Sequence, residues 1–539
     1  METATIVGLQ NKFTEAAQTA WSWAVKRSNH NDGQWRSLGP FLVAALAAIL
    51  VWSHLAKKTT KSRLPLPPGP RGVPFLGCIP YLEPDIHSWF ARLAREYGPI
   101  ISLRLGQKLY VVVSSPSLAK ELLKDQDATF ANRDAPPGSL ALLSGVHGMG
   151  WAPYGARWRM LRRVCMGEIL NSSKLDISYD VRRSAVREMV AEVHGGTGAP
   201  INVGNVMFVV MYKVITGLLW GGSVAEKEKR QVGDEFQQVV EYLTSVFCKP
   251  DVSDFFPVLA PFDLGGVFRQ TKKGGVRLEQ ILDSLINQSQ KRSNTEGTRD
   301  FLQILLKIQN SGDPKTPLTR SHIKSLLMEL VLVGNDTTWT TMEWAMTEVM
   351  KHPEVMKKAQ EELDKVVGRS YPVEEADLPN LHYVNAFVKE ALRLHPVVPL
   401  MLPRTPSEST PVGGYMVPKG SRVLVNMWAI QRDPAAWESP EEFRPERFMT
   451  GNDGKREFTG NDFHYFPFGS GRRICPGMAL AEKMLMYVMA TLLHSFDWKL
   501  PQGTELEVSE KFGIVLKKAK PLMAVPTPRL SDPDLYTCN

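Results

Sequence analysis

The sequence predicts a mainly α-helical protein with small β-sheets, an α+β fold preceded by one transmembrane helix near the N-terminus. Three observations carry this prediction: long stretches of helix-forming composition, a few short runs of β-branched residues between turn signals, and one uncharged apolar run ahead of the remainder. Of the 539 residues, 43% are hydrophobic and 22% are charged. This apolar content is enough to bury a large core, which excludes a disordered or low-complexity protein.

Charge and cysteine content narrow the class further. Lysine and arginine number 64 against 56 aspartates and glutamates, which gives a net charge of +8. So small an excess over this length is weak evidence for nucleic acid, and we predict no nucleic-acid partner. The cysteines are odd in number, widely spaced and without a CxxC pair, so neither a disulfide framework nor a zinc site is predicted. A reduced, cytosol-facing body is expected, with at least one cysteine free to act as a ligand or nucleophile. The five are Cys78, Cys165, Cys248, Cys475 and Cys538.

The uncharged apolar run covers residues 38–55 and comes close to the ~20 residues that cross a bilayer. Basic residues flank the cytoplasmic end of a membrane helix, and four follow this run at once: Lys57, Lys58, Lys61 and Arg63. A buried core helix is one alternative. A cleaved signal peptide is disfavoured, because a long segment precedes the run and no clear cleavage site follows it. We therefore predict a lumenal segment over 1–37, an uncleaved transmembrane anchor over 38–56, and a body on the cytosolic side.

Four prolines between residues 65 and 70 favour an extended, semi-rigid spacer, so residues 57–70 are predicted to form a basic, Pro-rich hinge. No second linker or repeat follows, and residues 71–539 are predicted to form one large body. Strands are expected at residues 100–105, 109–113 and 422–426, where β-branched residues lie between turn signals. A body of this length exceeds a typical domain, which suits a prosthetic group bound at its centre.

Cys475 carries the strongest chemical signal in the chain. It precedes a predicted helix over residues 478–496, and the free N–H groups at such a helix start lower the pKa of a thiol and favour the thiolate. Glycines around it permit the close approach of a flat ligand, and two arginines suit an anionic group beside the thiolate. These neighbours are Gly469, Gly471, Gly477, Arg472 and Arg473. An inert buried cysteine is the alternative, since such cysteines are common.

Two glycine motifs do not fit a nucleotide-binding loop. The stretch GSGRRICPG lacks the Lys-Ser/Thr ending of a phosphate loop, and no strand leads into it. The GMG at residues 148–150 lacks the third glycine of the dinucleotide motif, because Pro153 stands in its place.

A long helix is predicted near residues 321–351, and one of its faces changes character half-way along. The face is aliphatic from Ile323 to Val331, and the same period then reaches Gly334 and the threonines Thr337, Thr338 and Thr341. Glycine and tandem threonines cost helix propensity, so a purely structural helix would gain by avoiding them. A helix distorted by packing is the alternative. The functional interpretation is a local opening over a ligand, where a hydroxyl holds oxygen or water.

The cysteine loop matches a known signature. Phe468, Gly471, Arg473, Cys475 and Gly477 fit FxxGxRxCxG position for position, and in this the chain resembles the cytochrome P-450 superfamily. The resemblance implies the cytochrome P-450 fold with haem b as cofactor. It also implies that Cys475 is the axial thiolate ligand of the haem iron and that Arg473 pairs with a haem propionate. Such a thiolate pushes electron density onto iron and favours cleavage of the O–O bond.

A second signature agrees with the first. Glu390 and Arg393 lie three residues apart on one helix face, which alone indicates no more than a surface ion pair. Together with Arg447 in the stretch PERF, they resemble the ExxR motif and the buried structural triad of the same superfamily.

Two further stretches extend the resemblance. GNDTT is similar to the oxygen-activation motif, which implies that Asp336 and Thr337 relay protons to dioxygen. Val333 departs from this motif, because the family has a small residue there, and a β-branched side chain is expected to narrow the pocket or shift the helix kink. Trp158 and Arg162 fit the WxxxR pattern, which implies contact with a haem propionate, and Arg404 is carried over to the same role.

The anchor, basic flank and proline hinge resemble the plant microsomal A-type class. That class implies a single-pass protein of the endoplasmic reticulum membrane with its catalytic domain in the cytosol. Because the chain has no NADPH motif, electrons are expected from NADPH through an NADPH-cytochrome P-450 reductase. The basic helix of the WxxxR pattern is either a solvated surface or the docking face for this acidic donor, through Arg157, Arg159 and Arg163.

The resemblance implies a monooxygenase that uses O2 to hydroxylate, or otherwise oxidise, a small lipophilic plant specialised metabolite. Similarity to geraniol-hydroxylase-like enzymes favours a terpenoid, and a flavonoid or phenylpropanoid hydroxylase is the alternative. A haem-thiolate isomerase or dehydratase and a haem-binding non-enzyme are disfavoured, because the acid–Thr pair and the cysteine loop are intact. By family analogy the substrate walls are the loop at 135–146, the helix face at 331–333, the strand at 397–402 and the turn at 512–515. These stretches hold a ligand mainly by burial.

Overall fold

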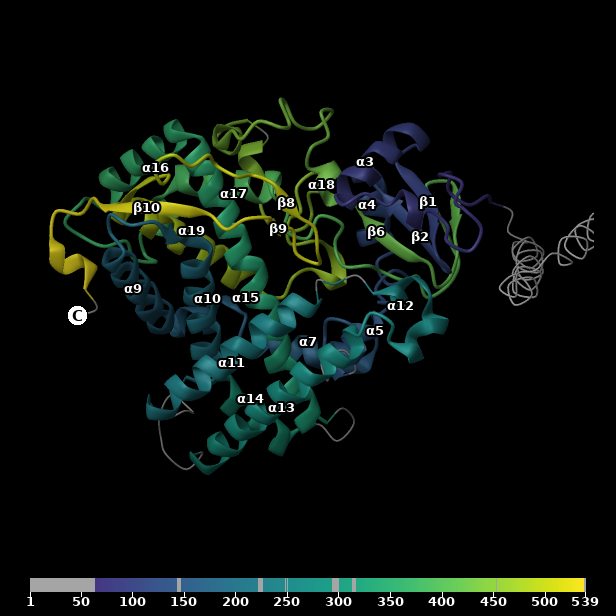
Figure 1. Cartoon of the computed structure of the whole chain (residues 1–539), viewed down its shortest axis with the longest axis horizontal. Coiled ribbons are helices and arrows are strands. Elements are labelled where there is room, and N and C mark those ends of the chain that lie inside the picture. The colour runs from purple at the N-terminus through teal and green to yellow at the C-terminus, as the bar shows by residue number, and fades with distance from the viewer. Residues whose placement is uncertain are drawn as a thin grey trace, which may run out of the picture. The chain divides into compact units, whose positions relative to one another are not determined.

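The computed structural model describes residues 64–537 apart from 143–146, 222–225, 248, 250, 293–299, 313–316 and 452. The predicted lumenal segment, the transmembrane anchor and the first part of the hinge lie outside the described residues, as do Cys248 and Cys538. The described body is mainly helical with four small sheets, which confirms the predicted fold class (Figure 1).

The helix α15 (Arg320–Lys351) runs through the middle of the body (Figure 1). It begins at a capping box, in which the Thr319 hydroxyl accepts the His322 N–H at 3.2 Å and His322 Nδ1 accepts the Thr319 N–H at 3.2 Å. It packs against α10 (Val203–Trp220), α17 (His382–Leu394) and α19 (Met478–Ser495). The predicted helix over 321–351 and its aliphatic stripe are confirmed, since Ile323, Leu326, Leu327 and Val331 are fully buried.

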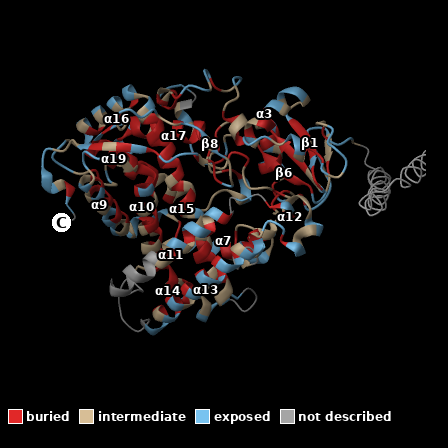
Figure 2. Cartoon of the chain, in the orientation of Figure 1, coloured by how far each residue is buried: buried red, intermediate tan, exposed pale blue. Residues whose placement is uncertain are grey.

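Within the described residues, α10 is the one helix long and apolar enough to cross a membrane, but it lies in the core. Most of α10 is buried against α15 and α9 (Tyr179–Gly195), so its hydropathy reflects burial on nearly all sides (Figure 2).

All three predicted strands lie in one sheet. β1 (Ile100–Leu105) pairs antiparallel with β2 (Lys108–Val113), and β2 pairs parallel with β6 (Arg422–Val425). Gly106 adopts a φ of 59° in the tight turn between β1 and β2, a conformation that favours glycine. The sheet packs through β1 on α3 (Ile86–Tyr97), which also contacts α18 (Met427–Ile430), at the opposite end of the body from α9 (Figure 1).

The remaining strands form three smaller sheets or pairs, and all of them except β10 have four residues or fewer. The other sheets contain β3 (Ile201–Asn202), β10 (Met523–Pro528) and β7 (Phe496–Lys499), then β4 (Thr410–Val412) with β5 (Tyr415–Val417), and β8 (Glu510–Lys511) with β9 (Lys517–Lys518). The other helices are α4 (Pro116–Lys120), α5 (Pro137–Leu140), α7 (Ala156–Glu168), α8 (Ser172–Ile177), α11 (Glu226–Phe247), α12 (Val252–Phe255), α13 (Val267–Arg292), α14 (Phe301–Ser311) and α16 (Pro353–Val366).

One predicted strand is wrong. Residues 397–402 form no strand, because Pro399 and Pro403 have no N–H to donate to a ladder. A turn forms instead, in which the Met401 N–H donates to Val398 O at 3.0 Å and Met401 takes a φ of 53°. Bridge pairing of the strand type begins only at Arg404, which exchanges two hydrogen bonds with Val423, whereas Val397 O and Pro399 O accept single bonds from the N–H groups of Leu516 and Trp428.

The described part of the predicted hinge is bonded to the body. The Ser102 N–H in β1 donates to Pro68 O at 2.8 Å, its hydroxyl donates to Pro67 O at 2.6 Å, and the Met416 N–H donates to Pro65 O at 2.8 Å. The proline run therefore lies along the sheet, where its fixed φ values keep it extended.

Candidate active site

Cys475 lies in a loop whose shape depends on glycines. The loop joins a short 3-10 turn, Gly471–Arg473, to α19, and the Cys475 N–H donates to Phe468 O at 2.9 Å. Gly469 and Gly471 have φ values of 76° and 70°, and a Cβ on Gly471 would lie 2.2 Å from Leu123 O. Only glycine fits such a position, so the loop geometry follows directly from the motif.

Cys475 precedes α19 as predicted, but the predicted lowering of its thiol pKa is wrong. Burial raises the pKa of Cys475, and this outweighs the opposing effects of the Gly477 N–H and the Arg162 charge, which both favour the thiolate. A metal bound at the sulfur would restore the thiolate, because a coordinating thiol loses its proton.

Arginines and one tryptophan gather next to this loop. Arg473 donates to Ala131 O at 2.8 Å and Met149 O at 3.0 Å, and its guanidinium lies 4.7 Å from the centroid of the Trp158 ring. Arg162 lies 5.8 Å from the same ring. Burial, together with the positive charges of Arg404 and Arg162, lowers the pKa of Arg473 to about 10. Such crowding of buried positive charge favours the binding of an anion.

One buried donor of this group has no partner within the described residues. Trp158 is 5% exposed, and its Nε1–H has no acceptor. Buried N–H groups are nearly always hydrogen-bonded, so this donor fits an acceptor that a bound ligand brings.

The structure places Arg404 somewhat differently from the prediction. Its guanidinium is buried, pairs with Asp127 Oδ1 at 3.2 Å and donates to Ser470 O at 3.0 Å. Asp127 also accepts the Arg472 N–H at 2.8 Å, so Arg404 already has a protein counter-charge and braces the cysteine loop.

Arg133 is a site residue that the sequence analysis missed. It donates to Pro403 O at 3.0 Å, and its Nε is buried without an acceptor among the described residues. Burial and the charges of Arg404 and Arg473 hold its pKa well below the usual range. Arg133 belongs to no motif and to no periodic pattern in the sequence, so its position beside the cysteine loop is evident only from the tertiary structure.

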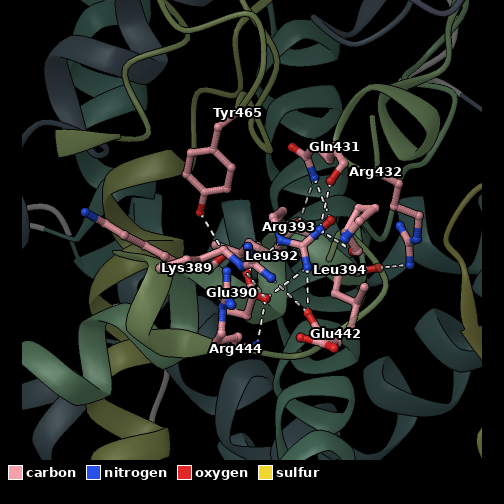
Figure 3. A network of polar contacts seen from close by, with 12 residues as sticks. Lys389, Glu390, Leu392, Arg393, Leu394, Gln431, Arg432, Glu442, Arg444 and Tyr465 are labelled. Atoms are coloured by element: carbon pink, nitrogen blue, oxygen red, sulfur yellow. Dashed lines mark hydrogen bonds and ion pairs between the residues drawn. The ribbon is translucent and has the colours of Figure 1, made fainter. Parts of the chain in front are cut away.

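The predicted triad is assembled at the end of α17, and Figure 3 shows two of its members, Glu390 and Arg393. Glu390 accepts Arg393 Nε at 2.7 Å and Nη2 at 2.9 Å, and Arg447 Nε pairs with the same carboxylate at 2.9 Å. The Arg444 N–H adds a fourth bond at 2.9 Å. Arg393 also donates to three backbone carbonyls, those of Gln431, Pro440 and Glu442.

Threonine hydroxyls follow α15 past Gly334 and bond to its backbone. Thr337 Oγ1 donates to Val333 O at 3.0 Å, and Thr338 and Thr341 donate in the same way to the carbonyls four residues earlier. Val333 is 58% exposed although Val331 and Asn335 beside it are buried. The face bearing Val333 and Thr337 therefore has open space in the middle of the body.

Asp336 points to other partners than Thr337 does. Its Oδ1 accepts Lys517 Nζ of β9 at 2.5 Å and Trp339 Nε1 at 3.2 Å. Burial raises the pKa of Asp336, although Lys517 opposes this. The two predicted proton-relay residues are adjacent in the chain, but they do not contact each other through their side chains.

Comparison with known proteins agrees with this geometry. The family description Cytochrome P450 matches residues 67–525. The chain is 40% identical to a flavonoid 3'-monooxygenase of Crocosmia x crocosmiiflora, over 87% of this chain and 93% of that protein. It is 38% identical to a geraniol 8-hydroxylase of Catharanthus roseus, over 90% and 98%. A zebrafish cytochrome P450 solved with progesterone superposes with a TM-score of 0.72 at 28% identity, over 83% of this chain and all of that one.

The residues of the site fit the cofactor that this family implies, haem held through a cysteine thiolate and supplied with electrons through a reductase. Cys475 offers the sulfur, and the unpaired Trp158 Nε1–H with Arg162 and Arg473 offers donors for acidic groups on the haem edge. The fold, the cysteine loop and the relatives lead to one conclusion: the chain belongs to the cytochrome P450 family and is a monooxygenase of plant specialised metabolism.

Proposed function

We propose that this chain is a membrane-anchored hydroxylase of a small lipophilic terpenoid, with the haem iron held by Cys475. The haem site is assigned mainly from the buried Trp158 Nε1–H, which has no partner among the described residues and lies beside two arginines. Cys475 lies close by, in a loop that requires Gly469 and Gly471. Arg162 and Arg473 would neutralise the haem propionates, the Trp158 Nε1–H would donate a hydrogen bond to one of them, and Arg404 braces the cysteine loop through Asp127 and Ser470 O. Phe468 and Gly477 shape the loop around the sulfur. Glu390, Arg393 and Arg447 brace the core next to it.

Haem, when bound, would activate dioxygen with two electrons from the NADPH-dependent reductase and two protons, so that one oxygen atom enters a C–H bond and the other leaves as water. The chain's own contribution is to deliver protons. Lys517 is partly exposed, with 23% of its side chain accessible, and contacts Asp336, so protons can pass from solvent to a buried carboxylate. The Thr337 hydroxyl, which donates to Val333 O four residues earlier, would be free to turn from this carbonyl and offer a hydrogen bond to a ligand on the open face.

The composition of the predicted walls supports a terpenoid substrate. The four stretches, 135–146, 331–333, 397–402 and 512–515, contain no charged side chain, and their polar side chains are two serines, Ser139 and Ser144. Residues next to these stretches bring them together: the N–H of Leu516, which follows the turn at 512–515, donates to Val397 O at 2.8 Å, and Lys517 pairs with Asp336 of α15. A substrate with one hydroxyl suits such walls better than one with several polar groups.

A flavonoid is the second candidate, because the flavonoid 3'-monooxygenase relative is 40% identical and the geraniol hydroxylase relative 38%. So small a difference does not separate the two substrate classes.

The proposal includes location and redox partner. The uncharged run at 38–56 anchors the chain in the endoplasmic reticulum membrane, with the body in the cytosol. Arg157, Arg159 and Arg163 are exposed on α7 and offer a basic face to an acidic NADPH-dependent reductase.

Two experiments test the proposal. Reduced microsomes containing the chain should show the thiolate-type Soret shift with carbon monoxide, and Cys475→Ser should abolish it. A wild-type chain without this shift ends the haem-thiolate assignment. Feeding of geraniol and of a flavanone, with reductase and NADPH, should give a hydroxylated product from geraniol. A product from the flavanone alone would replace the terpenoid assignment with the flavonoid one.

A further inference from the structure

The GMG motif at residues 148–150 has a partner in the central helix. The N–H groups of Met149 and Gly150 both donate to the Glu329 carboxylate, at 2.7 Å to Oε2 and 2.8 Å to Oε1. Each carboxylate oxygen thus binds one of two successive backbone N–H groups. Two hydrogen bonds from successive backbone N–H groups to one side chain fix the segment on α15.

The glycine and the glutamate fit each other. A Cβ on Gly150 would lie 3.1 Å from Glu329 Oε1, so a side chain at this position would push the carboxylate away. A second contact lies earlier along the same helix, where the rings of His147 and His322 are 5.8 Å apart. The segment 147–150 therefore follows α15 through two contacts seven residues apart.

Glu329 shares its helix face with the open part of the site. Residues four apart in a helix lie above one another, so Glu329, Val333 and Thr337 form one row. Val333, one turn from Glu329, is the 58% exposed member of that row. The segment that Glu329 holds thus borders the space next to Val333.

The same segment reaches the arginine of the cysteine loop. Met149 donates its N–H to Glu329 and accepts Arg473 Nη1 on its carbonyl oxygen at 3.0 Å. A single residue therefore connects the central helix with Arg473, two positions before Cys475. Burial raises the pKa of Glu329 to about 7, against the effects of the two N–H groups and Arg473, which agrees with an enclosed carboxyl.

We propose that Glu329 is a positioning residue: its carboxylate holds the 147–150 segment against α15, which limits the space open to substrate beside Val333 and orients Arg473. The first part stands on the described contacts. The part that concerns substrate and Arg473 rests on the proposed function.

The main test compares Glu329→Gln with Glu343→Gln. Glutamine has one acceptor oxygen and a donor amide, so it cannot bind two N–H groups at once. Glu343 is the matched control, because it is a buried glutamate of α15 that accepts the backbone N–H of Leu522 at 3.0 Å. In the purified holoenzyme, amide hydrogen exchange of the peptide over 147–152 should become about tenfold faster in Glu329→Gln and stay unchanged in Glu343→Gln. Unchanged exchange in Glu329→Gln overturns the proposal.

A second measurement reports on the space beside Val333. Imidazole and 4-phenylimidazole are titrated against the haem spectrum of each variant. Glu329→Gln should change the dissociation constant of 4-phenylimidazole by about threefold or more and leave that of imidazole nearly unchanged, because only the larger probe meets the segment. Equal effects on both probes overturn the substrate part of the proposal. A wild-type chain that binds no haem refutes the proposed function instead, and the exchange result then stands alone.

Gly150→Ala keeps the test decisive if Glu329→Gln folds poorly. Its added methyl group presses on Oε1, so it should also speed exchange over 147–152. If both substitutions act through the same contact, amide exchange over 147–152 in the double variant should be only slightly faster than in either single variant. Fully additive effects would contradict a shared contact.

Discussion

Replacement of Glu390 by glutamine should destabilise the body severely. Glu390 is fully buried and accepts four hydrogen bonds, three of them from Arg393 and Arg447. Glutamine removes the negative charge and leaves one acceptor oxygen. Both arginines keep their backbone carbonyl partners, but two buried positive charges lose their only carboxylate in this network. Removing one partner of a buried ion pair costs about 3–5 kcal/mol, and we expect a loss in that range.

The matched control is Glu446→Gln in the neighbouring 3-10 turn. Glu446 pairs with Lys358 at 2.6 Å, but the two side chains are 40% and 51% exposed, and the hydrogen bond that Glu446 accepts from Tyr383 Oη at 3.0 Å can be kept by the glutamine oxygen. An exposed ion pair contributes about 0–1 kcal/mol, so this variant should unfold almost like the wild type.

The assay is urea unfolding of the purified holoenzyme, followed by tryptophan fluorescence and by loss of the haem spectrum. The midpoint for Glu390→Gln should fall well below both the wild-type and the Glu446→Gln midpoints. If the free energy of unfolding of Glu390→Gln is within about 1 kcal/mol of that of Glu446→Gln, the Glu390 charge does not stabilise this part of the core through Arg393 and Arg447.

Three further predictions follow from the site. Thr337→Ala should raise the peroxide released per NADPH consumed several-fold, while Thr337→Ser keeps the hydroxyl and wild-type coupling; equal coupling in all three chains would remove Thr337 from proton delivery. Lys517→Met removes the cation 2.5 Å from Asp336, so the pKa of that carboxyl should rise further. The acidic limb of the pH–rate profile should then move to higher pH. An unchanged acidic limb would show that the Lys517–Asp336 pair takes no part in turnover. Glu329 has a folded pKa of about 7 against an ordinary 4.5, so the stability it contributes is full below the ordinary value and is lost as pH rises through about 7. The unfolding free energy of the wild type should therefore fall relative to that of Glu329→Gln between about pH 5 and about pH 8, and parallel curves would contradict the raised pKa.

Local patterns in the sequence predicted local structure well. The three strands of the main sheet, the long helix α15 and the helix after Cys475 all lie where composition and spacing placed them. The contact of Glu390 with Arg393 follows from helical spacing. Arg447, by contrast, is 57 residues from Glu390, and only the resemblance to a family indicated that the two meet.

Where the sequence misled, tertiary context decided the outcome. The run at 397–402 is apolar enough for a strand, but its prolines forbid the ladder. The helix start after Cys475 does favour the thiolate through the Gly477 N–H, yet burial of the sulfur outweighs this effect. Glu329 is a single charged residue in an otherwise apolar stretch of α15, which was the signal in the sequence that this position is unusual. Its partners, the N–H groups of Met149 and Gly150, are known only from the structure.

The parallel pairing of β2 with β6 has a consequence for biosynthesis. Val113 is paired with Val425, so the third strand of this sheet is made 312 residues after the second. At about 5–20 residues per second, the ribosome needs roughly 15–60 s to supply it. During that time the β1–β2 hairpin keeps one long edge unpaired, and an open strand edge invites pairing with other chains. The nascent chain therefore depends on protection of this edge until residues 422–425 have left the ribosome.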